Sequence, residues 1–446
     1  MLPYTWGQMI VVIVMTALTA LAARLGKAVF HDGIRPIIPE LLEGRMERRE
    51  LAGISFGLSK GFITSVGIPM AITFQLLNPW LLFLPTDVLG ILARRWWMAV
   101  LLGAAWGAVA LPGLAGMLSL LSAMPVDMMS AMKAFGYPVA GVIALFPLVA
   151  ILYQFGWRKA LGSASFVAAA AVLLARLTDA GLAGMAAASS LLSLAALAIF
   201  VAAKQRRLRR EAGAASTSVH AELSAAEEEE QQRIHAKALV KSLPLFMAIG
   251  ACASIACNLG VFAGTDAAMP FLQSAWQGDS EGQAGWLASA AAVDFARLLS
   301  FVPMIAATAL ATGVYGAAGM MLMFPVGYLS PNPVVAGCLG ALVIALEVVA
   351  VRRMAKAAEV YPVMREAADY IRSAMNATLE IGFLIGGLLA VIKMEGGTPG
   401  FGLIAFILLY LANEGMGRPV MRVAIGPVAA LLTGLLLNAV SLLPGL

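Results

Sequence analysis

The chain has 446 residues, of which 61% are hydrophobic and only 12% charged, and its formal net charge is +5. A soluble domain of this size cannot bury so much apolar surface, so the excess has to face lipid. Its three cysteines lie in apolar stretches and only three histidines are present, which argues against a disulfide scaffold or a metal centre. The net positive charge is typical of the cytoplasmic loops of membrane proteins, so we expect a lipid bilayer as partner and no nucleic acid. We also expect no metal and no cofactor.

Apolar stretches long enough to cross a bilayer, which takes roughly 20 residues, recur along the chain. No Lys or Arg precedes the first of them, as a signal peptide would require, so we expect a retained helix at Gln8–Ala23. The others in chain order are Gly61–Thr86, Trp96–Val126, Ala134–Trp157, Gly162–Ala175, Leu182–Ala203, Ser242–Thr265, Leu298–Leu346, Ile381–Ile392, Phe401–Ala412 and Val423–Leu443. The sequence therefore predicts an all-α, polytopic transmembrane helical bundle of about 10-12 membrane elements.

A polar segment at 204–241 divides the chain into a first transmembrane half, 1–203, and a second, 242–446. It opens with the five cations of the run KQRRLRR. Such clusters mark the cytoplasmic side, so we expect this segment to be a cytoplasmic linker of a bacterial inner (plasma) membrane protein. The stretch Gly264–Gly285 contains no Lys or Arg and is expected on the opposite side.

Three short elements recur in the same order in the two halves. The paired segments are Asp32–Arg35 with Asp294–Arg297, Gly61–Gly67 with Gly313–Gly319, and Phe83–Asp87 with Tyr328–Asn332. Transporters are commonly built from two such repeats, inverted or parallel, around a site near the bilayer midplane. Proline breaks a helix, and the freed backbone groups are tolerated at membrane depth only inside protein or beside a wet cavity. We therefore predict two pseudo-symmetric repeats whose proline-bearing segments are re-entrant or broken helices that line the site.

Polar and ionisable groups within apolar stretches are expensive and mark candidate solute-binding positions. The residues predicted to bind the substrate are Thr86, Asp87, Asp294, Arg297, Ser330 and Asn332, with Lys60 and Thr312 as outer candidates. Arg297 would bind a carboxylate or phosphate, and Asp87 or Asp294 would carry a coupling proton. As alternatives, the pairs Asp32/Arg35 and Asp294/Arg297 would only fix helix ends, and Lys60 would extend to the membrane surface.

The chain is not predicted to be an enzyme, because it contains no nucleophile elbow, no catalytic pair of carboxylates and no Walker lysine. The first hypothesis is a transporter that moves a small polar solute by alternating access, with anionic, sugar-like and amino-acid-like solutes all open. Two alternatives stay open: an intramembrane enzyme acting on a lipid-linked substrate, and a non-transporting scaffold of a membrane complex.

Four motifs carry a resemblance to known families. They are FHDGIRP at Phe30–Pro36, FLPTD at Phe83–Asp87, ALATGVY at Ala309–Tyr315 and GYLSPNP at Gly327–Pro333. With these motifs the chain resembles the YhfT family of bacterial inner-membrane proteins over almost its whole length, which implies a transporter. It is more distantly similar to the membrane (EIIC) subunits of galactitol- and ascorbate-type phosphotransferase systems. That similarity implies inverted repeats, re-entrant hairpins and a homodimer, with separate partner subunits for any phosphotransfer.

Overall fold

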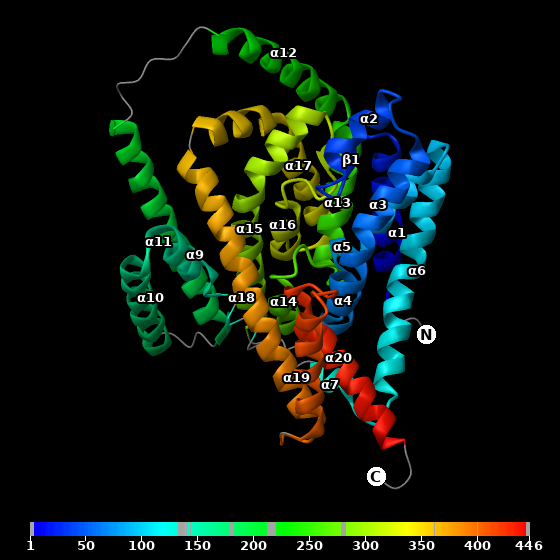
Figure 1. Cartoon of the computed structure of the whole chain (residues 1–446), viewed down its shortest axis with the longest axis vertical. Coiled ribbons are helices and arrows are strands. Elements are labelled where there is room, and N and C mark those ends of the chain that lie inside the picture. Colours follow the sequence, from blue (N-terminus) through cyan, green and yellow to red (C-terminus); the bar gives the residue numbers. More distant parts are fainter. Residues whose placement is uncertain are drawn as a thin grey trace.

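Helices make up almost all of the regular structure in the computed structural model of this chain (Figure 1). The structure describes residues 4–132, 139, 141–142, 144–177, 182–211, 220–277, 282–360, 362–398 and 400–442. The predicted all-α fold is confirmed. The division into two halves with a linker stays a prediction. The predicted linker, 204–241, falls on two helices, and residues 212–219 between them lie outside the described part.

The N-terminal part begins with a long apolar helix, turns back through short elements, and ends with a second long helix. In order, it contains α1 (Trp6–Arg24), β1 (Ala28–Val29), the 3₁₀ turn η1 (Arg35–Ile37), α2 (Ile38–Leu42), α3 (Arg48–Phe62), the π-helical turn η2 (Ile63–Gly67), α4 (Ile68–Phe74), α5 (Pro79–Leu92), α6 (Trp96–Ser122) and α7 (Met128–Met132). A capping box between Thr5 and Gln8 starts α1. Asn78 caps α5 by accepting a hydrogen bond from Leu81 N at 3.0 Å.

The rest of the described chain is also helical apart from one short strand. It contains α9 (Phe146–Phe155), α10 (Trp157–Leu177), α11 (Leu182–Glu211), α12 (His220–Lys241), α13 (Leu243–Asn258), α14 (Met269–Gln277), α15 (Gln283–Thr312), β2 (Tyr315–Gly316), α16 (Met323–Leu329), α17 (Pro333–Val360), α18 (Pro362–Met394), α19 (Phe401–Gly415) and α20 (Arg422–Ser441). Ion pairs hold the polar segment to the bundle, because Lys204 bonds Glu366 at 2.6 Å and Arg352 bonds Glu229 at 2.8 Å.

Five described helices are long and apolar enough to cross a membrane. They are Trp6–Arg24, Trp96–Ser122, Pro333–Met354, Asp369–Met394 and Arg422–Ser441. A sixth candidate is the pair Glu229–Lys241 and Leu243–Asn258, which is bent by 59°. Large apolar side chains such as Leu101, Val109 and Val349 are exposed on these helices, as lipid-facing side chains are.

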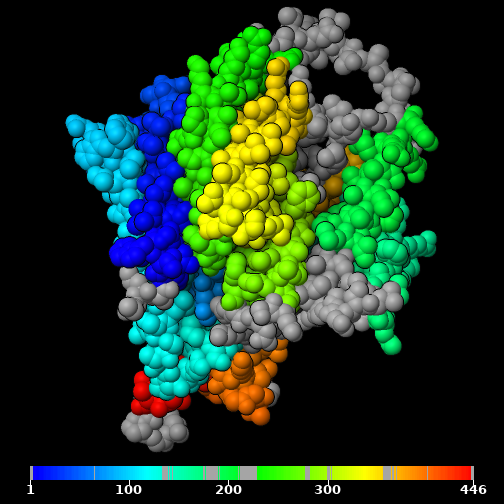
Figure 2. Space-filling model, turned by 180° about the vertical axis from the view of Figure 1, so that it is seen from behind, coloured from blue at the N-terminus to red at the C-terminus, as the bar shows by residue number. Residues whose placement is uncertain are grey.

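Two groups of helices form the centre of the bundle. α1 packs against α5 and α6, α13 packs against α16 and α17, and α1 and α13 contact each other. Figure 2 shows α1 (blue), α13 (green) and α17 (yellow) as adjacent columns on one face. Two short parallel backbone pairings also join the groups: β1 pairs with β2, and Leu77 pairs with Phe262. These pairings place the segments after α1 and α13 side by side with the segments before α5 and α16.

The predicted helix break at Pro85 is wrong. Helix α5 runs without interruption through this proline, because packing against α1, α3 and α6 holds it on several sides. The chain instead turns at residues with left-handed φ values, which include Gln75 (58°), Gly260 (69°) and Gly313 (68°). The second predicted break, Ser330–Pro333, is a turn, because α16 ends at Leu329 and α17 begins at Pro333.

Candidate functional site

A cavity lies where the segments after α1 and α13 meet. It has about 730 Å³ of space that protein atoms do not fill, part of it open to the surroundings. Its walls come from both central helix groups, together with the ends of α3 and α5, the middle of α15 and the turn after β2. The lining residues are Phe30, His31, Asp32, Arg35, Phe62, Trp80, Gly264, Thr265, Asp266, Arg297, Ile305, Gly316, Ala318, Gly319 and Met321.

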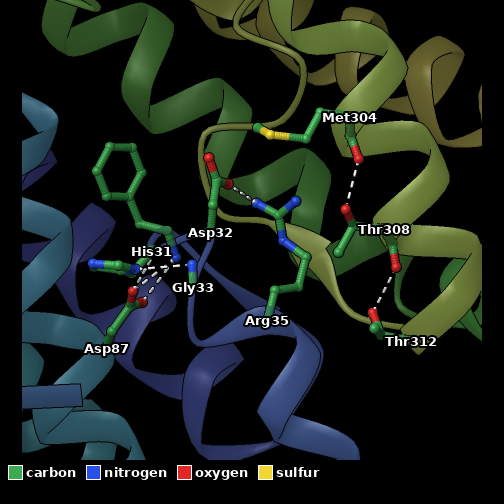
Figure 3. Close-up of polar contacts among 9 residues, drawn as sticks. His31, Asp32, Gly33, Arg35, Asp87, Met304, Thr308 and Thr312 are labelled. Atoms are coloured by element: carbon green, nitrogen blue, oxygen red, sulfur yellow. Dashed lines mark hydrogen bonds and ion pairs between the residues drawn. The ribbon is translucent and has the colours of Figure 1, made fainter. Parts of the chain in front are cut away.

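The first charged group of the cavity is the ion pair of Asp32 and Arg35. Arg35 Nη2 donates to Asp32 Oδ1 at 2.7 Å, and Figure 3 shows the guanidinium reaching Asp32 beside Met304 and Thr308 of α15. The Arg35 side chain is only 2% exposed, whereas that of Asp32 is 46% exposed. Arg35 Nε and Nη1 are buried without a hydrogen-bond partner. Unpaired buried donors of a charged group are costly, so an acceptor that reached these two nitrogens would be stabilised.

The second charged group is the ion pair of Asp266 and Arg297. Arg297 Nη1 donates to Asp266 Oδ1 at 2.5 Å. Both side chains are largely buried, with 11% of Arg297 and 7% of Asp266 exposed. The pair joins the turn after α13 to the middle of α15. The cavity therefore contains two acids and two bases, one ion pair from each half of the chain.

Aromatic rings form another wall of the cavity. Phe62 and Trp80 stack with ring centroids 4.9 Å apart and planes 9° from parallel. Phe30 meets Trp80 edge-on at 5.4 Å, and the His31 ring meets Phe62 edge-on at 5.6 Å. Such geometries are the favourable ones for aromatic pairs, so the wall is well packed and offers a flat apolar surface.

Three buried carboxyl groups hold the lining segments in place from behind. Asp87 accepts hydrogen bonds from Phe30 N at 2.8 Å and His31 N at 2.9 Å. Glu347 accepts from Tyr315 Oη at 2.8 Å and Met320 N at 2.7 Å, which fixes the turn after β2. Backbone donors that would otherwise be unpaired near the cavity are satisfied in this way.

The third of these carboxyl groups, Asp294, acts on the turn after α13. It accepts hydrogen bonds from the hydroxyls of Thr265 and Tyr328, the latter at 2.9 Å. Tyr328 Oη in turn accepts from Gly264 N at 2.6 Å. Asp294 therefore positions Gly264 and Thr265, which line the cavity, but does not line it itself.

Of the residues predicted to bind solute, Arg297 lines the cavity. Asp87 and Asp294 lie one hydrogen bond behind it. Thr86 and Thr312 donate their hydroxyls to carbonyl oxygens of their own helices, those of Phe83 and Thr308.

The remaining three predicted residues are not part of the cavity wall. Ser330 donates to Val326 O at 2.7 Å, and Asn332 caps α17 by accepting from Val335 N at 2.9 Å. Lys60 is exposed near the end of α3. The cavity does not bring these three together with Arg297.

Several cavity residues were not among the predicted binding residues. Asp32 and Arg35 were noted as an ion pair, but the burial of the guanidinium depends on β2 and α15, which are distant in sequence. Asp266 lies in the stretch Gly264–Gly285 that was expected outside the membrane, yet Thr265 and Asp266 are buried. The signal in the sequence was the single acid directly after an apolar helix in each half.

Within the described ranges, no three His, Cys, Asp or Glu side chains come close enough together to hold a metal ion. The charged cavity groups are instead tied to each other as Asp–Arg pairs. The groups that a ligand in the cavity would meet are therefore the Arg35 guanidinium, the exposed Asp32 carboxylate and the aromatic wall.

The long apolar helices with their exposed apolar side chains define a polytopic α-helical membrane protein. The chain belongs to the YhfT family, whose model, described as a protein of unknown function, matches residues 8–445. It is 43% identical over 434 residues to the uncharacterized protein YhfT of Escherichia coli (strain K12), which covers 97% of this chain and 96% of that protein. The family membership expected from the motifs is confirmed. No solved structure matches the chain.

Proposed function

We propose that this chain is an inner-membrane transporter that moves a small polar solute by alternating access between two inverted structural repeats. The observation that carries the proposal is the cavity to which each half contributes one acid, Asp32 or Asp266, paired with an arginine. Charges inside an apolar bundle are costly, and membrane proteins keep them where a solute or ion uses them. A cytoplasmic position of 204–241 and a homodimer belong to the same proposal.

The directions and pairings of the central helices support inverted repeats. α1 rises toward β1, whereas α13 descends from α12 (Figure 1). β1, which follows α1, pairs with β2, which precedes the helix pair α16 and α17. Phe262, which follows α13, pairs with Leu77, which precedes the helix pair α5 and α6. A two-fold axis that exchanges the halves produces this reciprocal pattern. We therefore take α1, α3, α5 and α6 to correspond to α13, α15, α16 and α17.

Glycines support the same correspondence residue by residue. A Cβ added to any of four glycines would lie too close to a backbone oxygen of the first helix of its half. These glycines, with the residue whose oxygen each approaches, are Gly90 (Ala20), Gly103 (Thr16), Gly327 (Ser254) and Gly340 (Gly250). The spacing between the two glycines is the same in both halves, and so is the spacing between the approached residues. Close helix contacts of this kind rely on glycine in membrane bundles.

One position is exchanged between the halves in a complementary way. Gly107 packs against Thr16 in the first half, and Gly250 packs against Ile344 in the second. When the two halves are aligned on Gly103 with Gly340 and on Ala20 with Ser254, Gly107 corresponds to Ile344 and Thr16 to Gly250. A small residue faces a larger one in both halves, with the roles reversed. Because close packing demands such compensation, the exchange favours a real repeat over a chance similarity.

The two cavity acids correspond in this register. Asp32 follows Ala20 by the same number of residues as Asp266 follows Ser254. This pairing differs from the motif comparison, which set Asp32 against Asp294. A binding site with one equivalent acid from each repeat lies on the axis that relates them, where exchange of the two repeat conformations would open it to either side.

The proposal is tested by uptake into proteoliposomes that contain the purified full chain. We would measure accumulation of radiolabelled amino acids, sugars, sugar acids and sugar phosphates, with protein-free liposomes as background. Wild-type protein is expected to accumulate at least one class, Arg297→Ala to lose that uptake, and Arg418→Ala to keep it. Arg418 is a matched control because its partner is the surface carboxylate Glu414. Absence of uptake for the whole panel, or full uptake by Arg297→Ala, would overturn the proposal.

A further inference from the structure

The balance of charges and apolar rings in the cavity points to a ligand class. We propose that the cavity binds a small zwitterion, an α-amino acid with an apolar or aromatic side chain, whose carboxylate bonds Arg35 and whose ammonium bonds Asp32. The inference rests on the proposed function in that it names the solute of the same site. It differs from the earlier expectation, which left sugars, anions and amino acids equally open.

The charge count of the cavity favours a neutral ligand over an anion. Asp32 and Arg35 form one ion pair, and Asp266 and Arg297 form the other. Four such groups sum to zero charge, so a bound phosphate dianion would add two uncompensated charges to an apolar surrounding. Desolvating unpaired charge in such a place is expensive. A zwitterion brings one charge of each sign and leaves the balance unchanged.

The two charged ends of the ligand have separate partners in the cavity. Arg35 Nε and Nη1 are buried without a hydrogen-bond partner, although the guanidinium lines the cavity. A carboxylate is the natural acceptor for two guanidinium donors. The Asp32 carboxylate is 46% exposed and therefore reachable for an ammonium group. Because Asp32 and Arg35 are neighbours at 2.7 Å, both ends of one α-amino acid can be bound together.

The body of the ligand would contact a mainly apolar wall. Phe30, Phe62 and Trp80 form an aromatic cluster, and Ile305 and Met321 are further apolar lining residues. Ligand pockets of this composition bury apolar parts of the ligand and orient them with a few polar groups. An aromatic or aliphatic side chain would remove this wall from water.

A sugar fits the same cavity poorly. Among the lining residues that the structure describes, Thr265 has the one side-chain hydroxyl, and it already donates to Asp294. A polyol has several hydroxyls that would each need a partner, and a buried polar group left without one is penalised. Carboxylate and guanidinium groups can also bind hydroxyls, but those of this cavity are already joined to each other as the Asp32–Arg35 and Asp266–Arg297 pairs.

The test measures binding of a matched ligand series to the purified full chain by thermal shift and by isothermal titration. The probes are L-phenylalanine, 3-phenylpropionate without the ammonium, phenethylamine without the carboxylate, D-gluconate and inorganic phosphate. Phenylalanine is expected to bind, and each truncated analogue to bind at least about tenfold more weakly, because each loses a hydrogen-bonded charge contact. Tighter binding of gluconate, phosphate or either truncated analogue than of phenylalanine would overturn the proposal.

A pair of variants adds a residue-level check. Arg35→Gln should weaken phenylalanine binding at least about tenfold without weakening phenethylamine binding, because it removes the carboxylate contact and leaves the Asp32 carboxylate in place. Arg418→Gln, remote from the cavity, should bind phenylalanine as wild type does. Equal phenylalanine affinity of Arg35→Gln and wild type would refute the assignment. Uptake of another solute without phenylalanine binding would sink this inference alone, whereas phenylalanine binding without any transport would sink the proposed function alone.

Discussion

Replacing Asp87 by alanine tests how the cavity is held in shape. The Asp87 side chain is fully buried in α5, and its carboxyl group accepts hydrogen bonds from Phe30 N and His31 N at 2.8 and 2.9 Å. Asp87→Ala leaves two backbone donors without their partner, and each unpaired donor costs about 1–3 kcal/mol. The free energy of unfolding of the variant should therefore be lower than that of wild type by about 2–6 kcal/mol. Both N–H groups donate to the same oxygen, Asp87 Oδ2, which the amide oxygen of Asn can replace, so Asp87→Asn should lose clearly less stability than Asp87→Ala.

The assay is reversible unfolding of the purified protein in mixed micelles, followed by circular dichroism as dodecyl sulfate is added. Asp369→Ala removes an exposed carboxyl group of α18 and serves as the matched control, with no expected change. Because Phe30 and His31 line the cavity, Asp87→Ala should also weaken ligand binding. Equal stability of Asp87→Ala and Asp369→Ala would refute the view that this carboxyl group anchors the cavity wall.

Two further predictions concern packing and ion pairing. Gly90→Ala should destabilise the protein by about 1–3 kcal/mol in the same unfolding assay, because its Cβ would press on the backbone of α1. Gly113→Ala is the control: this glycine has open space around it, so the variant should be neutral or slightly stabilised. Arg297→Ala should cost about 3–5 kcal/mol because it leaves Asp266 charged and buried, and adding Asp266→Ala should recover part of that loss. A double variant less stable than Arg297→Ala would contradict the ion-pair prediction. Equal stability of Gly90→Ala and Gly113→Ala would contradict the packing prediction.

The sequence predicted those parts of the fold that depend on local composition. The long apolar runs that became α1, α6 and α17 were visible, because a membrane span needs a continuous stretch of apolar residues. The break expected at Pro85 was wrong, because proline's local effect on a helix is weaker than the packing around α5. Turns instead fall at residues with left-handed φ, such as Gly313, for which the sequence offers many equally plausible glycines.

The candidate site was predicted only in part, because it is assembled by contacts between distant segments. Arg297, predicted to bind the solute from its position in an apolar stretch, lines the cavity, and its role in binding stays a prediction. Asp87 and Asp294 were recognised as buried, but which backbone or side-chain donors they meet depends on the pairing of the two halves. Asp266 looked like part of a surface loop, and its segment is drawn inside by contacts distant in sequence, the backbone pairing of Phe262 with Leu77 and the ion pair of Asp266 with Arg297.

Access to the cavity from both sides of the membrane tests the central claim most directly and needs no knowledge of the solute. A single cysteine would replace Ala318, which lines the cavity, in a chain whose native cysteines 252, 257 and 338 are changed to alanine. A membrane-impermeant thiol reagent would then be applied to oriented proteoliposomes from outside or loaded inside them. We expect labelling of residue 318 from both sides. Labelling from one side alone would contradict alternating access at this cavity.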